Sequence, residues 1–198
     1  CVYCQDDIAT AFLAMLIGAM RQLSLDDPWL LRSDLGPVID PVAKARISKH
    51  IAQAADQNRV LWTQPVPLQG HYVAPTLIRV SGIEALEQEV FGPVLHLATF
   101  ASHQINAVIE AINNTGYGLT FGLQTRLSNR TRDIAQRTMA GNIYVNRNQI
   151  GAVVGSQPFG GHGLSGTGPK AGGPFYLNRF YAVGQQNISH SWDQIMSQ

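Results

Sequence analysis

Two short stretches of the sequence combine residue types that could bind ligands. The first is Glu89-Val90-Phe91-Gly92-Pro93, in which an acidic and an aromatic side chain flank a Gly-Pro kink. A carboxylate can accept hydrogen bonds from paired hydroxyls such as those of a ribose, and an aromatic ring offers a flat apolar face. An ordinary turn at the entry to a strand would have the same composition, so the residues alone leave both interpretations open.

The second stretch follows an expected strand and is rich in small residues. It contains Gly151-Ala152-Val153-Val154-Gly155 and Gln157-Pro158-Phe159-Gly160-Gly161. Small residues after the end of a strand leave backbone N–H groups uncovered, and successive N–H groups can form a concave anion-binding nest. The sequence therefore indicates an anion-binding loop here.

Other motifs with known chemistry are incomplete. Gly161-His162-Gly163-Leu164-Ser165-Gly166 matches G-x-G-x-x-G, but Pro158 precedes it and no acid follows near Gln185, as a dinucleotide-binding fingerprint would require. We interpret it as a folded glycine turn. The six histidines lack metal-ligand spacing, so no metal site is expected. No nucleophile elbow occurs either, and the chain holds no complete catalytic constellation of its own.

Composition excludes further classes of protein. Among 198 residues, 14 Lys and Arg face 13 Asp and Glu, a net charge of +1 that argues against a nucleic-acid partner. Hydrophobic residues make up 45% and charged residues 14%, which fits a globular domain. The most apolar window, residues 8–20, is too short to span a bilayer, and no signal-peptide pattern is present. We expect a cytoplasmic location.

The two cysteines, Cys1 and Cys4, lie on an expected strand. Side chains at that spacing point to opposite faces, so a disulfide between them is not expected. Redox C-x-x-C motifs stand at a helix N-terminus, whereas this pair precedes one, and we predict reduced thiols. Because Cys1 falls inside an apolar run, we also expect the sequence to be a piece of a longer protein.

Apolar periodicity and capping residues predict helices that alternate with strands. Four helices are predicted, each with a capping residue at its start. The caps are Asp6 or Asp7, then Asp40 with Pro41 at the first helical position, then Ser102, and then Ser128 with Gly141 at C′. Predicted strands cover residues 1–4, 60–62, 73–80, 94–100, 119–124 and 142–146. This alternation is typical of an α/β layered domain with a largely parallel sheet. Residues 151–173 predict a long loop, and such loops are usually functional.

Several segments of the sequence resemble the aldehyde dehydrogenase superfamily. Glu89-Val90-Phe91-Gly92-Pro93, Gly118-Leu119 and Gly141-Asn142-Ile143-Tyr144-Val145-Asn146 are similar to the C-terminal half of its members. The run that continues through Gly166-Thr167-Gly168-Pro169-Lys170-Ala171-Gly172-Gly173-Pro174 resembles one branch. That branch is the L-glutamate-γ-semialdehyde (pyrroline-5-carboxylate) dehydrogenase module of the bifunctional proline utilization A proteins.

The resemblance implies a fold and a reaction. It implies a three-layer α/β catalytic domain over residues 1–181, followed by a tail, residues 182–198. It also implies NAD-dependent oxidation, in which a cysteine thiolate attacks the aldehyde, hydride passes to the nicotinamide and water hydrolyses the thioester. The nucleophilic cysteine, the general base and the dinucleotide-binding domain would all lie upstream of Cys1. Neither Cys1 nor Cys4 is then the nucleophile, and the chain alone is expected to be inactive.

The resemblance also assigns binding residues. Glu89 matches the acid that holds the nicotinamide ribose hydroxyls, and Phe91 matches an aromatic that packs beside that ribose. Gly151 and Ala152 match a loop whose backbone N–H groups bind the substrate α-carboxylate. Phe159 matches an aromatic that lines the aliphatic part of the substrate.

Two departures from the branch and two alternatives remain. His162 stands where the branch usually carries an acid, and residues 181–198 are unfamiliar. The enzyme could act on another aldehyde, or the domain could be a non-catalytic binding or assembly module with the same fold. For the intact protein we expect a small-molecule substrate, a homo-oligomeric state and no membrane segment within this chain.

Overall fold

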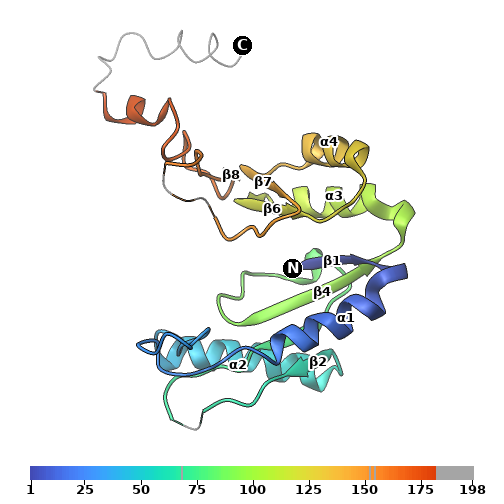
Figure 1. Cartoon of the computed structure of the whole chain (residues 1–198), viewed down its shortest axis with the longest axis vertical. Helices are drawn as coiled ribbons and strands as arrows, with labels where there is room; N and C mark the ends of the chain where they lie inside the picture. Colours follow the sequence, from blue (N-terminus) through green and yellow to red (C-terminus); the bar gives the residue numbers. More distant parts are fainter. Residues whose placement is uncertain (68, 152, 154, 182–198) are drawn as a thin grey trace. The chain divides into compact units, whose positions relative to one another are not determined.

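The computed structural model describes residues 1–67, 69–151, 153 and 155–181. It divides into two compact units, Cys1–Thr115 and a second that begins at Gly116 (Figure 1). Each unit is described by itself. Ala152 and the expected tail, residues 182–198, lie outside the described residues, and the single domain over residues 1–181 stays a prediction.

The first unit is built on a four-stranded sheet with strand order β1-β4-β3-β2. The strands are β1 (Val2–Gln5), β2 (Val60–Thr63), β3 (Thr76–Arg79) and β4 (Val94–Phe100). β1 and β3 both run parallel to the central β4, while β2 pairs antiparallel with β3 at the edge. The expected largely parallel sheet is therefore confirmed, with one antiparallel edge strand.

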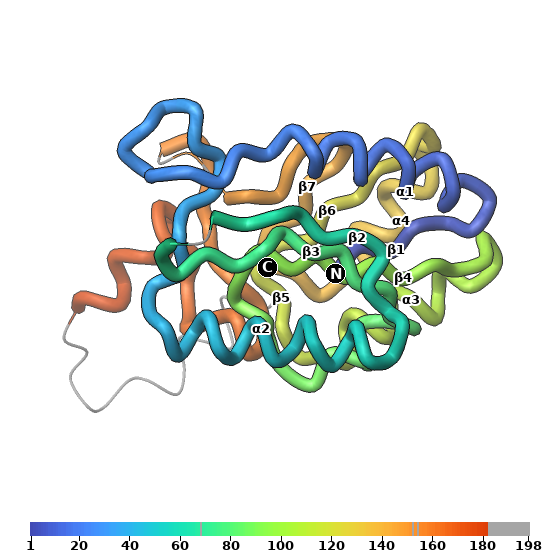
Figure 2. The backbone as a smooth tube through the Cα atoms, turned by 90° about the horizontal axis from the view of Figure 1, so that it is seen from below, coloured from blue at the N-terminus to red at the C-terminus, as the bar shows by residue number. Residues whose placement is uncertain are grey.

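Helices α1 (Asp6–Met20) and α2 (Pro41–Asp56) cover opposite faces of this sheet (Figure 2). Leu77 and Leu97 join the core cluster that includes α1, whereas their neighbours Ile78 and Ala98 join the cluster that includes α2. Successive side chains of a strand point to opposite faces, so a sheet covered on both sides needs apolar residues at consecutive positions. The expected three layers are present in this unit.

The second unit contains two small sheets. β6 (Thr120–Leu123) runs parallel to β7 (Asn142–Val145), and β5 (Tyr117–Gly118) pairs antiparallel with β8 (His162–Gly163). Between β6 and β7 lies α4 (Ser128–Arg137), and a 3₁₀ helix, η3, covers Tyr176–Phe180. Apart from β8 and an isolated bridge between Phe159 and Ala171, the described part of residues 151–173 is irregular, as predicted.

The predicted start of α2 is confirmed, whereas one predicted strand is too long. The Asp40 side chain accepts a hydrogen bond of 2.6 Å from the Ala43 N–H, and Pro41 occupies the first helical position of α2, the arrangement that a cap followed by proline favours. β3 is shorter than the expected strand over residues 73–80. Pro75 has no N–H to donate to a ladder, which limits the strand at that end.

Four capping predictions are wrong. At α1 the N-cap position is Gln5 with no side-chain cap, and both Asp6 and Asp7 are already helical. Ser102 opens a short 3₁₀ turn, η2 (Ser102–Gln104), ahead of α3 (Ile105–Asn114), and the Gln104 Oε1 accepts from the Ala101 N–H at 3.0 Å instead. Ser128 is already helical, and Leu127 precedes it with no side-chain cap. The α4 helix ends at Arg137, well before Gly141. A Cβ on Gly141 would collide with the Gly160 carbonyl oxygen, so close backbone approach explains the glycine.

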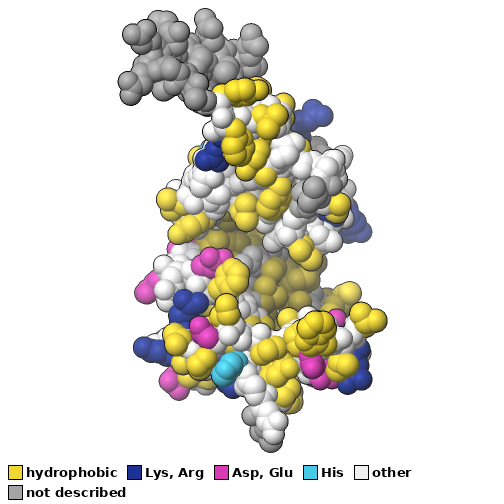
Figure 3. Space-filling view, turned by 90° about the vertical axis from the view of Figure 1, so that its left-hand side faces the viewer, with side chains coloured by type: hydrophobic (Ala, Val, Ile, Leu, Met, Phe, Trp, Pro, Cys, Tyr) yellow, Lys and Arg dark blue, Asp and Glu magenta, His cyan; other side chains and the backbone are white. Residues whose placement is uncertain are grey.

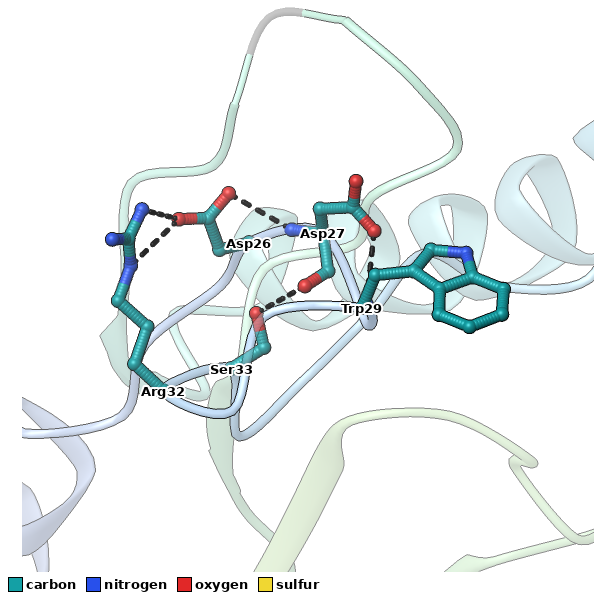
Figure 4. Close-up of polar contacts among 5 residues, drawn as sticks. All are labelled: Asp26, Asp27, Trp29, Arg32 and Ser33. Atoms are coloured by element: carbon teal, nitrogen blue, oxygen red, sulfur yellow. Dashed lines mark hydrogen bonds and ion pairs between the residues drawn. The ribbon is translucent and has the colours of Figure 1, made fainter.

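The long connection between α1 and α2 is held by polar contacts among its own residues (Figure 4). Arg32 forms an ion pair of 2.7 Å with Asp26, which holds the pKa of that carboxyl below its ordinary value. The Asp27 Oδ1 accepts from the Trp29 N–H at 3.0 Å, and Ser33 Oγ donates to the Asp27 carbonyl at 2.7 Å. These contacts fold the connection while leaving the Trp29 side chain 93% exposed.

The surface carries many hydrophobic side chains. On the face shown in Figure 3 they outnumber charged side chains. Within the described residues, the helices are too short or too polar to cross a membrane.

Candidate functional site

The segment that carries Glu89 and Phe91 is a turn between η1 (Ile83–Ala85) and β4. The carbonyl of Pro93 accepts from the Thr76 N–H of β3 at 3.0 Å, and Val94 N–H donates to the Gly92 carbonyl at 2.8 Å. These bonds tie the end of the turn to the sheet.

The same turn rests on helix α2. A Cβ built on Gly92 would lie 2.5 Å from Cδ1 of Ile47, a residue of α2 that is 1% exposed. No larger side chain fits at position 92 without displacing buried atoms. Sequence order alone puts Glu89 and Phe91 on one turn, and the structure shows that sheet and helix both support it.

Glu89 and Phe91 are presented outward from this support. The Phe91 ring is 77% exposed, and the Glu89 carboxylate is exposed with no hydrogen-bond or ion-pair partner in the part of the chain that the structure describes. An unpaired carboxylate beside an exposed ring fits a ribose, since vicinal hydroxyls donate to carboxylate oxygens and the sugar face packs on an aromatic. The binding roles expected for Glu89 and Phe91 stay predictions.

The second unit brings Gly151 and Phe159 together. A Cβ on Gly151 would stand 3.9 Å from the Phe159 ring, and Gly151 has φ +148°, a conformation that favours glycine. The Gly151 N–H makes no hydrogen bond to another described residue. An available N–H beside a half-buried ring fits a ligand with a charged end and an apolar stem. Ala152, the other predicted anchor, lies outside the described residues.

Phe159 is held in place by a residue that the sequence analysis missed. Asn142, at the start of β7, is buried; its Nδ2 donates to the Pro158 carbonyl at 3.0 Å and its Oδ1 accepts from the Gly160 N–H at 3.1 Å. Phe159 also exchanges two backbone hydrogen bonds of 3.0 Å with Ala171. The polar residue in an otherwise apolar strand, Asn142, is the signal that could have identified this support.

Behind this segment lies a cavity of about 500 Å³. It is lined mainly by prolines and small or aromatic residues, together with Asn142, Gln157 and Lys170. The Lys170 ammonium donates to the Gly141 carbonyl, and Gln157 Nε2 donates to the Tyr144 hydroxyl at 2.8 Å. These polar groups already bond to the fold, so they act as supports of the loop.

Asn146 closes the end of β7. Its Oδ1 accepts from the Thr125 N–H and its Nδ2 donates to the Thr125 carbonyl, both at 2.9 Å, while the residue itself adopts φ +54°. Asparagine tolerates this left-handed conformation better than most residues. Asn146 thus fixes the strand end from which the Gly151 loop departs.

The G-x-G-x-x-G segment is not a phosphate cradle in this structure. The N–H groups of Leu164, Ser165 and Gly166 donate to the carbonyls of Gly116, His162 and Gly163, respectively. Backbone N–H groups that are already bonded cannot coordinate a phosphate. The glycines instead permit close packing, because a Cβ on Gly161 would collide with the Ser165 carbonyl.

Cys4 does not have the environment of a nucleophile. Cys4 is buried, and this desolvation, reinforced by the negative charges of Asp7 and Asp6, raises the pKa of its thiol. A raised pKa disfavours the thiolate that acts as a nucleophile. Cys1 and Cys4 are both free thiols. Among the described residues, no group of three or more His, Cys, Asp and Glu could hold a metal ion.

A three-layer α/β unit with a mostly parallel sheet, followed in the chain by a unit with a long glycine-rich loop, defines an α/β domain of a kind found in many enzymes. The chain belongs to the aldehyde dehydrogenase family, whose model matches residues 1–185.

The curated relatives point to one branch of that family. The bifunctional protein PutA of Escherichia coli (strain K12) is 48% identical over 187 residues, covering 90% of this chain and 14% of that protein. The 1-pyrroline-5-carboxylate dehydrogenase 1 of Halalkalibacterium halodurans is 34% identical over 174 residues, covering 86% of this chain and 33% of that protein. The chain therefore spans only a small part of the relatives it matches.

Solved structures agree in fold. A crystal structure of Bradyrhizobium japonicum proline utilization A (PutA) superimposes with a TM-score of 0.86 at 47% identity, covering 90% of this chain and 18% of that one. A 1-pyrroline-5-carboxylate dehydrogenase from Thermus with bound NAD superimposes with a TM-score of 0.80 at 29% identity, covering 90% of this chain and 34% of that one. The expected aldehyde dehydrogenase fold and the resemblance to PutA are confirmed.

Proposed function

We propose that this chain is part of the catalytic domain of an NAD-dependent L-glutamate-γ-semialdehyde dehydrogenase of proline catabolism. Its substrate is the open-chain aldehyde formed from 1-pyrroline-5-carboxylate, and its product is L-glutamate. One observation carries the proposal. The same chain matches both a bifunctional PutA and a separate 1-pyrroline-5-carboxylate dehydrogenase. The aldehyde dehydrogenase activity is the one that two such proteins share.

The chain's part in the reaction is to hold the cofactor and the far end of the substrate. Oxidation of the aldehyde to the acid consumes water and removes a hydride, which NAD accepts when bound. The Glu89 carboxylate accepts hydrogen bonds from the nicotinamide ribose, and the exposed Phe91 ring packs beside that sugar. Two supports under one turn hold the backbone that carries both side chains, which limits the entropy lost on binding.

On the substrate side, the N–H groups of Gly151 and Ala152 bind the α-carboxylate, and Phe159 lines the aliphatic chain. Charge-assisted hydrogen bonds fix the carboxylate end, and this places the aldehyde carbon for attack. Simple aldehydes lack that carboxylate and gain nothing from the anchor.

The nucleophile and the general base come from polypeptide upstream of Cys1 in this proposal, since the family resemblance puts both there and the buried Cys4 thiol is unsuited to attack. The chain alone then forms no NADH. The exposed side chains of Trp29, Leu31 and Ile39, all more than nine-tenths accessible, support a role within a larger protein or oligomer.

The test is Gly151→Val in the full-length enzyme, with Gly155→Val as a matched control. Both glycines lie in one loop at positive φ, so the two variants share backbone strain. We expect kcat/KM for glutamate semialdehyde to fall about 10- to 100-fold in Gly151→Val, which is the worth of one or two charge-assisted hydrogen bonds. Activity on butanal should match that of Gly155→Val.

Two outcomes would change the assignment. Equal losses on both aldehydes, or no loss on either, would contradict the carboxylate anchor and favour another aldehyde substrate. A full-length protein that forms no NADH with any aldehyde would support the non-catalytic binding or assembly module.

A further inference from the structure

A histidine pair joins α2 to β4. The Nε2 atoms of His50 and His96 are 2.9 Å apart, and their rings meet edge to face with centroids 5.1 Å apart and planes at 72°. His96 is 5% exposed and lies on the sheet face that α2 covers, between Val94 and Ala98 of the same core cluster. His50 is half-buried on the helix.

A bond between two such nitrogens requires one defined proton arrangement. One ring must carry its proton on Nε2 and donate, and the other must carry its proton on Nδ1 and accept. Adding a proton to each ring would set one N–H against the other and break the contact. The bond therefore exists only while at least one ring is neutral.

The surroundings keep the pair neutral. Burial lowers the pKa of His96 to about 4, helped by His50 and Arg59. Burial and the Arg59 guanidinium also lower the pKa of His50. From β3, the register partner of His96 is the apolar Ile78. The charged groups acting on the pair are thus cations, and near neutral pH both rings are uncharged.

The pair lies next to the turn of the candidate site. Ile47 and His50 are three residues apart on α2 and so share one helix face. Ile47 contacts Gly92 of the turn, and His50 bonds to His96, two residues after Val94, where the turn enters β4. One helical segment therefore touches both the turn and the strand that follows it.

We propose that the His50–His96 hydrogen bond is a positioning device, which fixes α2 against β4 and thereby sets the place of the turn that presents Glu89 and Phe91. Its effect on the turn is independent of ligand. Its effect on NAD binding rests on the proposed function. A buried hydrogen bond between one defined donor and one defined acceptor adds a directional constraint to the apolar packing of a helix.

The first test measures the pair in the unaltered 198-residue chain. Nitrogen-15 NMR should find one ring protonated on Nε2 and the other on Nδ1, with scalar coupling between the two Nε2 atoms. Two rings of the same tautomer without coupling would overturn the proposal. This measurement needs no variant and does not depend on how a substitution folds.

The second test is hydrogen exchange in His50→Ala, chosen because alanine suits a helix and His50 is only half-buried. The reporters are the Thr76 and Val94 amides, which bond to Pro93 and Gly92. We expect their exchange to accelerate about tenfold or more, as for a segment that opens locally. The exposed His103→Ala is the control. Exchange within twofold of the unaltered chain in His50→Ala would overturn the proposal.

The third test concerns the cofactor in the full-length enzyme. In His50→Ala we expect KM for NAD to rise about fivefold while kcat changes little, the pattern of lost binding without lost chemistry. Accelerated exchange with an unchanged KM would support the positioning of the turn and contradict the assignment of Glu89 and Phe91 to NAD. Slow exchange with a raised KM would overturn the positioning and leave the proposed function intact.

Discussion

The Gly92 backbone lies directly on the Ile47 side chain. A Cβ at position 92 would come 2.5 Å from the Ile47 Cδ1 and 3.3 Å from its Cγ1, and Ile47 is almost completely buried between α2 and the sheet. Gly92 does not have a positive φ, so the position requires glycine because there is no room for a Cβ and not because of the backbone conformation. The turn of the candidate site and the core of the first unit are therefore coupled through one contact.

Gly92→Ala should destabilise the chain by about 1–3 kcal/mol, because an added methyl overpacks a filled core. Ile47→Val removes the colliding Cδ1 and should cost about 0.5–1.5 kcal/mol alone. The double variant should lose less stability than the sum of the losses in the two single variants, as expected for residues in contact. Urea denaturation measures the free energy of unfolding of the two single variants and the double variant.

The control for this cycle is Gly18→Ala in α1, where an added Cβ meets nothing within 4 Å. Alanine favours a helix over glycine by about 0.5–1 kcal/mol, so this variant should be more stable than the parent. Strictly additive costs of Gly92→Ala and Ile47→Val would show that Ile47 is not what excludes a side chain at position 92.

Gly141→Ala should be more damaging than Gly92→Ala, by roughly 2–4 kcal/mol, because the atom it meets is backbone. A Cβ at Gly141 would collide with the Gly160 carbonyl, and no side-chain truncation can relieve that contact. The Lys170 bond to the Gly141 carbonyl should be lost with it. Hydrogen exchange at Asn142 and Gly160 measures the loosening.

A suitable comparison is Gly155→Ala, where φ is +80° but nothing lies within 4 Å of the added Cβ. It should cost about 1 kcal/mol from the left-handed backbone alone. If Gly141→Ala were no worse than Gly155→Ala, the close approach of residues 141 and 160 would not be a constraint.

Regular elements were largely predictable from the sequence because their causes are local. The period of α1, the Asp40-Pro41 start of α2 and the apolar run of β4 each lie within a few residues. That Glu89 and Phe91 share one turn was predictable for the same reason, whereas their binding roles stay predictions.

What the sequence missed depends on contacts between distant residues. Gly141 resembled a helix C-cap, but the reason for it is the Gly160 carbonyl. The histidines looked scattered, although His50 and His96 meet across 46 positions. Ser102 and Ser128 had the right residue type for caps, yet the helices begin without their side chains as caps. Tertiary packing determines the roles of these residues, and the periodicity of the sequence does not reveal it.

Stability should depend on pH through His96. The unfolded ring takes up a proton near its ordinary pKa of 6.5, but the folded ring does so only at about 4. The contribution of His96 to the free energy of unfolding should therefore be complete above pH 6.5 and be lost as the pH falls towards 4. The loss should reach roughly 3 kcal/mol, at about 1.4 kcal/mol for each unit of pKa difference. Urea midpoints from pH 8 to pH 4 measure this dependence.

His96→Phe separates this contribution from that of carboxyl groups, whose protonation also destabilises the fold at low pH. The phenylalanine variant should have a shallower dependence between pH 6.5 and pH 4, with the difference confined to that window. Parallel curves for the two proteins would mean that His96 does not titrate differently in the folded and unfolded states.

Glu89→Gln in the full-length enzyme should raise KM for NAD about tenfold, since a neutral amide replaces a charged acceptor of ribose hydroxyls. The melting temperature should stay unchanged, because the Glu89 carboxylate is exposed and has no partner among the described residues. Glu87→Gln, a neighbouring exposed carboxylate, removes the same charge and controls for long-range electrostatic attraction of the cofactor. A similar rise in both variants would assign the effect to net charge, and the ribose contact would then lose its support.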